Sequence, residues 1–218
     1  MAPRLVCGFL LAAGLAAAPA SAAPDMTFRM APVGDPAKCG ARCPKAIVAE
    51  GEIVESTPAT FVDFVRRNAR DPSLRSVIFI HSPGGKVIAS MALGRAFRAV
   101  GAAAIVARVS GDGGVVAGTC FSACVYALMG AVKRVAPTGS KLGVHRMYTF
   151  EQGPDPTGSG AQRRRFDHGG MRDMLAKYSA RMGVSGDLVE FAERTPSDSI
   201  LMLSPRDIAR WRLATPNF

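Results

Sequence analysis

Apolar runs recur along the chain at spacings typical of alternating strands and helices, separated by short polar or glycine-containing links. Short β-branched or apolar runs predict strands, and longer segments with an apolar stripe at helical spacing predict helices. The predicted strands span residues 46–53 (with a bulge at Gly51), 76–80, 103–109, 133–136 and 142–145. The predicted helices span residues 57–70, 86–100, 121–131 and 165–182, and two more begin near residues 185 and 205. This alternation predicts one α/β domain with largely parallel strand pairing.

The start of the chain has the three parts of a secretory signal peptide. Arg4 precedes an apolar run over residues 5–18, and Ala20-Ser21-Ala22 matches an A-x-A cleavage site. The alternative, a membrane anchor, needs about 20 apolar residues, more than this run supplies. We therefore expect residues 1–22 to be a cleaved signal peptide and the mature protein to be exported, either to a periplasm or as a secreted protein. Residues 23–45, rich in Ala, Pro and Gly, predict an irregular lead-in.

The charge of the chain narrows the classes of partner. The formal net charge is +10, from 27 Lys and Arg against 17 Asp and Glu. A basic chain can bind nucleic acid or anionic envelope surfaces. The sequence has no aromatic-interleaved basic helix and no nucleic-acid motif, and the basic run 163–165 is typical of a solvated loop. We expect no nucleic-acid partner.

Four cysteines follow the predicted signal peptide: Cys39, Cys43, Cys120 and Cys124. An even number in an exported chain predicts disulfides, whereas a zinc site would add histidines or C-x2-C pairs. No metal is expected. The pair Cys39–Cys43 is favoured because both lie in a Gly/Pro-rich loop that can close a small ring. Cys120 and Cys124 flank a predicted helix start, where regular helix geometry disfavours a bridge, and long-range cross-pairing remains an alternative.

Three segments carry candidate chemistry. Ser82-Pro83-Gly84-Gly85 joins a predicted strand to a helix, so its amides lie at a helix N-terminus where negative charge is favoured. Ser122 lies near the first turn of an apolar helix, where a plain N-cap is the alternative interpretation. His145 ends a short strand and is the better candidate base than His81, which precedes the glycine turn, or His168, which lies in a polar stretch.

Together these segments resemble the proteolytic subunit of the Clp protease, within the crotonase-like superfamily. The resemblance covers residues 47–213 and includes the S-P-G-G turn, a serine at a helix start after small residues, and a histidine 23 residues later. The stretches 133–137 and 195–201 also resemble segments of that family. It implies a crotonase/Clp protease-like fold of repeated βαβ units with C-terminal helices, forming a single domain over residues 46–218.

The resemblance also implies roles for the residues. Ser122 would be the nucleophile, His145 the base and Asp198 the third triad member, with Glu193 and Asp187 as poorer fits. The amides of Gly85 and Ala123 would form the oxyanion hole. The implied activity is that of a serine hydrolase, a peptidase without cofactors, acting on peptides or unfolded proteins and assembling as a homo-oligomer.

Departures from the family pattern leave alternatives open. The loop before Ser122 is longer than usual, and two cysteines flank the serine. Signal-peptide peptidases of related fold use a Ser–Lys dyad, for which Lys133 or Lys141 would be the candidates. A catalytically inactive, peptide- or partner-binding scaffold is the main alternative function, and crotonase-type thioester chemistry is disfavoured because an exported protein meets little coenzyme A. Because no ATP is present outside the cytoplasm, no ATPase partner is expected.

Overall fold

The computed structural model describes residues 23–34, 36–110, 113–152, 162–166 and 169–218; the predicted signal peptide lies outside them. The strands are β1 (Thr27–Pro32), β2 (Lys45–Glu50), β3 (Leu74–His81), β4 (Ala103–Val109), β5 (Val115–Ala117), β6 (Thr119–Phe121), β7 (Lys133–Val135), β8 (Lys141–Val144), β9 (Thr149–Gln152), β10 (Gln162–Arg165) and β11 (Leu201–Met202). The helices are α1 (Pro36–Cys39), the 3-10 turn η1 (Gly40–Arg42), α2 (Thr57–Asn68), α3 (Val87–Ala99), α4 (Cys124–Gly130), α5 (Gly170–Arg181), α6 (Asp187–Glu193) and α7 (Pro205–Arg210).

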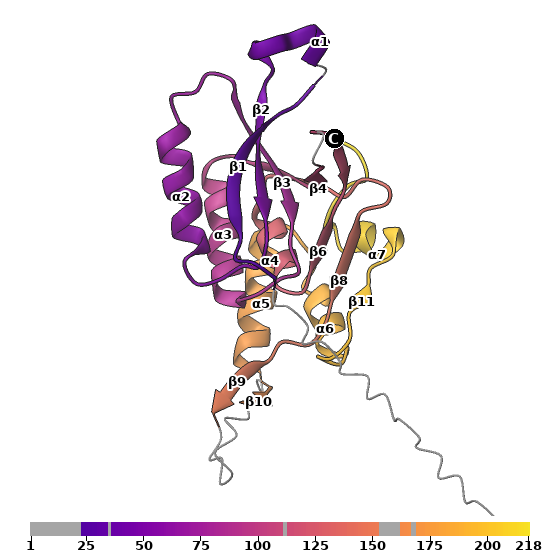
Figure 1. The fold of residues 1–218 in the computed structure, drawn as a ribbon. Helices are drawn as coiled ribbons and strands as arrows, with labels where there is room; N and C mark the ends of the chain where they lie inside the picture. The colour runs from indigo at the N-terminus through magenta and orange to yellow at the C-terminus, as the bar shows by residue number, and fades with distance from the viewer. Residues whose placement is uncertain (1–22, 35, 111–112, 153–161, 167–168) are drawn as a thin grey trace, which may run out of the picture.

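The larger sheet has the strand order β1-β2-β3-β4-β5, and β7 also pairs with β4. Strands β2, β3, β4 and β7 run parallel, whereas β1 and β5 are antiparallel to their neighbours. Figure 1 shows α2 and α3 together on one side of this sheet, with β6, β8 and β11 standing beside it. The α/β class with parallel central strands agrees with the sequence prediction.

The core lies mainly on the helical face of the larger sheet. Ile78 and Ile80 of β3 face Phe61 of α2 and Phe97 of α3 in one cluster, while Phe79 faces a smaller cluster on the other side. This division follows from the two-residue repeat of strands, which sends successive side chains to opposite faces. Because the side chains on both faces are buried here, residues 77–80 of β3 can be continuously apolar.

Helix α4 is buried along its whole length and packs against α3. The two backbones meet at Gly94 and Gly130, where a Cβ on Gly130 would overlap the backbone of Gly94. Glycine is therefore required at this crossing. The hydroxyl of Tyr178 in α5 donates a 2.9 Å hydrogen bond to the carbonyl of Tyr126 and fixes α5 against the same helix.

A second sheet, in the order β11-β8-β6, is joined to the first at Ser82. Ser82 continues β3 and forms a parallel bridge with Cys120 of β6; its amide donates to Thr119 and its carbonyl accepts from Phe121. The connection brings the end of β3 beside the end of β6. Among the described residues no helix has the length and apolar character needed to cross a membrane.

Several boundaries differ from those expected. The lead-in over residues 23–45 contains β1, which pairs in antiparallel register with β2. The predicted helix 121–131 begins only at Cys124, because residues 119–121 form β6. The helix expected from residue 165 begins at Gly170 and follows β10, and residues 153–161 lie outside the described residues.

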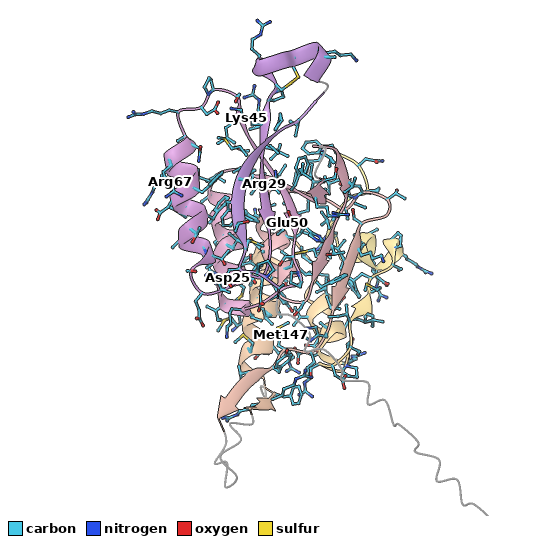
Figure 2. The ribbon with its side chains drawn as sticks, in the orientation of Figure 1. Asp25, Arg29, Lys45, Glu50, Arg67 and Met147 are labelled. Atoms are coloured by element: carbon cyan, nitrogen blue, oxygen red, sulfur yellow. A yellow bond between two sulfur atoms is a disulfide. The ribbon has the colours of Figure 1, made fainter. Side chains whose placement is uncertain are left out.

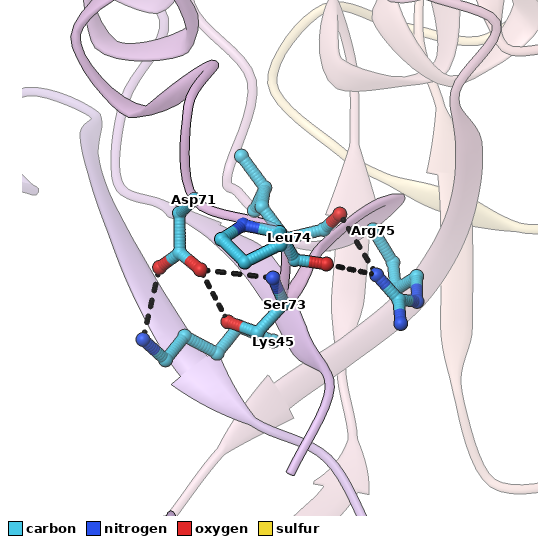
Figure 3. Close-up of polar contacts among 6 residues, drawn as sticks. Lys45, Asp71, Ser73, Leu74 and Arg75 are labelled. Carbon is cyan, nitrogen blue, oxygen red and sulfur yellow. Dashed lines mark hydrogen bonds and ion pairs between the residues drawn. The ribbon is translucent and has the colours of Figure 1, made fainter. Parts of the chain in front are cut away.

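The two ends of the parallel strands have different chemistry. Figure 2 labels Lys45 toward one end of β2, and Glu50 and Met147 toward the other. At the Lys45 end, the ammonium lies 2.9 Å from the carboxylate of Asp71, which also accepts from the amide and hydroxyl of Ser73 (Figure 3). These hydrogen bonds from Ser73 and Lys45 lower the pKa of Asp71 to about 2. The candidate chemistry lies at the opposite, carboxyl end.

Candidate active site

The turn after β3 is shaped by Ser82 and two glycines. The fully buried Ser82 hydroxyl accepts from the Gly84 amide at 3.1 Å. Gly84 and Gly85 have φ values of +114° and +131°, which side chains on L-residues disfavour. A Cβ on Gly84 would lie 2.7 Å from the carbonyl oxygen of Phe121 and 2.8 Å from the Cβ of Ser122. Only glycine at position 84 therefore allows the turn to lie this close to Ser122.

The backbone of Gly85 faces open space on one side. Ile53 donates to the carbonyl of Gly84 at 2.7 Å and accepts from the amide of Lys86 at 2.7 Å, so it pairs with both neighbours of Gly85. The Gly85 amide itself donates to no residue in the described part of the chain. Helix α3 begins directly afterwards, and the positive end of its dipole favours negative charge at this point. An anionic oxygen is the group that suits such a donor.

Ser122 lies in a tight turn between β6 and α4. Its φ is +52°, one of two positive φ values at non-glycine residues among those described. For an L-residue this conformation costs about 1–2 kcal/mol. The Ser122 amide donates to the carbonyl of Gly143 at 2.9 Å, whereas the amide of the buried Ala123 donates to no described residue. Since nearly all buried amides are paired, the free Ala123 amide is an unusual donor beside Ser122.

The turn is closed by a disulfide that the sequence disfavoured. Cys120 and Cys124 are bonded, with their Cα atoms 5.3 Å apart and both side chains fully buried. The expectation failed because it assumed a regular helix from residue 121, whereas the left-handed Ser122 folds the two cysteines toward each other. The favoured pair Cys39–Cys43 is also bonded, so cross-pairing is excluded.

His145 follows β8 and is 8% exposed. Its Nδ1 lies 2.9 Å from the carbonyl oxygen of Arg146. A carbonyl only accepts, so Nδ1 carries a proton, and in the neutral imidazole Nε2 then presents its lone pair. That is the tautomer a general base needs when Nε2 faces the substrate. Among the described contacts, no hydrogen bond joins the Ser122 hydroxyl to His145, as is common in free enzymes before the substrate tightens the site.

The acidic partner expected for His145 is not in contact with it. Asp198 is exposed, and the described contact at Nδ1 is the Arg146 carbonyl. The carboxylate of Glu193 instead reaches the strand end: it accepts from the Met147 amide at 3.3 Å and lies 3.5 Å from Nε of Arg146. Asp198 as the third triad member therefore stays a prediction, and Glu193 contacts the two residues that follow the histidine.

A buried hydroxyl lies within the electrostatic reach of Glu193. The hydroxyl of Tyr126 is fully buried and makes no hydrogen bond to any described residue. Burial first, and the negative charge of Glu193 second, raise the pKa of Tyr126. The phenol is thus kept neutral beside the carboxylate.

His81, the alternative base, has a structural role. Its Nδ1 accepts from the amide of Thr119 at 3.0 Å and lies 3.1 Å from the hydroxyl of Thr119, so the ring fastens β3 to β6. It does not line the cleft described below. His168 lies outside the described residues.

One cleft of about 1190 Å³ contains the candidate groups. Gly84, Gly85, Ser122 and His145 line it together. Its other walls combine apolar side chains with charged groups at the mouth, among them Glu52, Glu55, Lys86, Val87, Ile88, Met147, Phe166 and Met171. Neither Lys133 nor Lys141 is among the lining residues. Within the described part of the chain, no three His, Cys, Asp or Glu side chains gather as a metal site would require.

The sequence predicted the candidate site residues better than the groups that contact them. The missed groups are the Gly143 carbonyl, which accepts from the Ser122 amide, and the bonded Cys120–Cys124, while Glu193 was named only as a poorer fit for the triad. The symmetrical C-x-S-x-C spacing around Ser122 is the signal that could have indicated the bridge. The carbonyl and the carboxylate have no comparable signal, because their positions depend on strand pairing.

Comparison with known proteins shows a likeness in fold alone. No family model matches the chain, and no curated protein matches its sequence. A solved structure of the membrane-bound stomatin-specific protease 1510-N, a serine-to-alanine mutant, matches with a TM-score of 0.52 and 15% identity, over 77% of this chain and 76% of that one. A lysine-to-alanine mutant of the same protease, in complex with a substrate peptide, matches with a TM-score of 0.51 and 16% identity, over 79% and 74%. The chain therefore has a distant Clp protease-like α/β fold, the fold of a group of serine proteases.

Proposed function

We propose that the protein is an exported, ATP-independent serine hydrolase, a peptidase in which Ser122 attacks a carbonyl and His145 takes its proton. The observation that carries the proposal is the meeting, in one cleft, of a serine in a left-handed turn, the unpartnered amide of Gly85 and a histidine whose Nδ1 contacts a backbone carbonyl. The unpartnered amide of the buried Ala123 follows the serine directly. Each of these features costs stability or requires a special backbone, and together they match the needs of acyl transfer.

The two amides of Gly85 and Ala123 would stabilise the tetrahedral oxyanion. Removing one such donor in a serine protease costs about 3–4 kcal/mol. His145 would then pass its proton to the leaving amine, and water would release the acyl group from Ser122 by the same route in reverse. The acid that stabilises the charged histidine is Asp198 by resemblance, or Glu193 by its place in the free protein.

A peptide is the substrate that the cleft suits best. Gly85 is exposed and has an unpaired amide, so a peptide can lie along it and form a backbone hydrogen bond. One of the structural neighbours holds a substrate peptide. Outside the cytoplasm no ATP drives unfolding, so we expect short or already extended segments as substrates. Assembly as a homo-oligomer is part of the proposal, and light scattering at micromolar concentration tests it.

The test of catalysis is labelling with a fluorophosphonate probe, which reacts with activated serines. The wild type should be labelled, whereas Ser122→Ala should not be labelled and His145→Ala should be labelled far more slowly. Ser56→Ala is the matched control, because Ser56 is exposed and makes no capping hydrogen bond. Equal labelling of the wild type and Ser122→Ala would show that the probe reacts elsewhere and would reject the proposal.

A binding scaffold without catalysis is the second candidate. It is favoured by the lack of a described hydrogen bond between the Ser122 hydroxyl and His145 in the free protein. A scaffold would bind extended peptides, with an affinity that Ser122→Ala leaves unchanged, and would not be labelled by the probe. Fluorescence anisotropy with a peptide library, run beside the labelling, distinguishes the two functions.

A further inference from the structure

The disulfide between Cys120 and Cys124 encloses the candidate nucleophile. It links β6 to the first residue of α4, and Ser122 is the central residue of the five that the ring contains. Both cysteines are fully buried, so the bridge lies under the cleft. It spans a residue whose φ of +52° an L-residue seldom adopts.

Backbone hydrogen bonds hold both sides of this turn but leave one amide free. On the strand side, the Phe121 amide donates to Ser82 at 3.1 Å and the Ser122 amide donates to Gly143 at 2.9 Å. On the helix side, the carbonyls of Ser122 and Ala123 accept from the amides of Val125 and Tyr126, whereas the Ala123 amide has no acceptor among the described residues. A backbone hydrogen bond that closed residues 120–123 as a turn would use this donor. The disulfide links the two ends of the segment and leaves the amide free.

We propose that Cys120–Cys124 is a positioning disulfide that holds Ser122 and the Ala123 amide in their working geometry. This inference rests on the proposed function. When the bridge forms, the two thiols lose two protons and two electrons to a disulfide-bearing oxidant, which is reduced to its dithiol. The hydrolase therefore acquires its activity only after oxidation, as it would in an exporting compartment. A copy kept in a reducing cytoplasm has an unconstrained serine turn.

The second disulfide supplies a matched control. Cys39 and Cys43 also lie four positions apart and are bonded, but Cys39 ends α1, Cys43 follows η1 before β2, and neither lines the cleft. The double variants Cys120→Ala/Cys124→Ala and Cys39→Ala/Cys43→Ala thus each remove one small ring, and only the first ring contains the nucleophile.

The experiment measures fluorophosphonate labelling of the purified protein and separates the maximal rate constant from the probe's apparent dissociation constant. For Cys120→Ala/Cys124→Ala we expect the maximal rate constant to fall by about tenfold or more, since misplacement by about 1 Å can cost ~100-fold. The dissociation constant should stay unchanged because the cleft walls are untouched. Cys39→Ala/Cys43→Ala should label like the wild type. A loss of folding alone would lower the labelled fraction and leave this rate constant unchanged.

A second measurement does not depend on the variants. The wild type is unfolded and reduced with dithiothreitol, refolded with reductant present, and then oxidised with glutathione disulfide, with labelling measured before and after. We expect labelling to appear only with the oxidised Cys120–Cys124 pair, which peptide mapping after alkylation identifies. Free thiols at both positions in the purified protein overturn the inference, as do equal rate constants in the wild type and Cys120→Ala/Cys124→Ala. If the oxidised wild type has the bridge and is not labelled, the proposed function fails and the inference falls with it.

Discussion

Gly84→Ala is the substitution that most directly tests whether the glycine turn positions the serine. The added Cβ would lie 2.8 Å from the Cβ of Ser122, whereas ordinary contacts are 3.4–4 Å. The two atoms must therefore separate by about 0.6–1.2 Å. The same Cβ meets the Phe121 carbonyl oxygen at 2.7 Å, so backbone as well as side chain must move. The nucleophile cannot keep its place.

The expected magnitudes for activity and stability differ. A displacement of about 1 Å in a reacting group can cost ~100-fold in rate, so we expect Gly84→Ala to lower fluorophosphonate labelling by about that factor. The positive φ of +114° adds strain of about 1–3 kcal/mol. For a chain of this size each kcal/mol lowers Tm by about 2–4 °C. The midpoint of thermal unfolding should therefore fall by about 2–12 °C.

The control separates backbone strain from displacement of the serine. Gly101 has a φ of +63°, a Cβ added to it would meet no heavy atom within 4 Å, and it closes α3 away from the residues that line the cleft. Gly101→Ala should lower Tm and leave labelling unchanged. Thermal denaturation and labelling at a temperature well below both Tm values are the two assays. If Gly84→Ala labelled as fast as Gly101→Ala, the glycine turn would not position the nucleophile.

Three further predictions concern the pH dependence of stability, the carboxylate that supports His145, and the packing of α5 against α4. The pKa of Asp71 is lowered from 3.8 to about 2, so its ion pair stabilises the fold above about pH 4 and this stabilisation is lost as the pH falls toward 2. Asp71→Asn should therefore be less stable than the wild type at neutral pH and show a shallower fall in Tm between about pH 5 and pH 2. Parallel curves of Tm against pH for the two proteins would refute this. Glu193→Gln should slow fluorophosphonate labelling by about 10–100-fold. This is less than the ~10⁴-fold loss seen when removal of a triad carboxylate also changes the histidine tautomer. An equal or larger effect of Asp198→Asn would assign the acid to Asp198. Tyr178→Phe removes the hydrogen bond to Tyr126 and should cost about 1 kcal/mol of unfolding free energy, measured by urea denaturation; an unchanged midpoint would mean that this bond contributes nothing.

Local sequence patterns correctly predicted those strands and helices whose bounds are set by neighbouring residues. The strand over residues 103–109 was predicted with the bounds it has, because an apolar run lies between Gly101 and the glycine-rich loop. The last helix begins as expected, with Ser204 and Asp207 forming a capping box. The strand β1 could not be predicted in this way, because it is stable only through register with β2, and that pairing joins distant residues.

The serine segment shows why the site was only partly predictable. Motif order placed Ser122, His145 and Gly85, and the structure brings all three to one cleft. An apolar run cannot show where a strand of three residues ends and a helix begins, so the helix was started too early. That error hid the left-handed turn at Ser122, and with it the geometry that lets Cys120 bond to Cys124.

In the proposed mechanism the third member of the triad would have two tasks, and the free protein meets one of them without a carboxylate. One task is to fix the tautomer, and the carbonyl of Arg146 does so at 2.9 Å from Nδ1 of His145. The other is to stabilise the charged imidazole, for which a neutral carbonyl is weaker than a carboxylate by about half. A fully solvated charge 4 Å away contributes only about 1 kcal/mol, and a shielded one several times more. Asp198 is exposed, whereas the Glu193 side chain is 17% exposed and fixed to the next two residues after the histidine. Glu193 is therefore the better shielded carboxylate, although its 3.5 Å contact with Arg146 offsets part of its charge, and a bound substrate that shields Asp198 from water would favour Asp198.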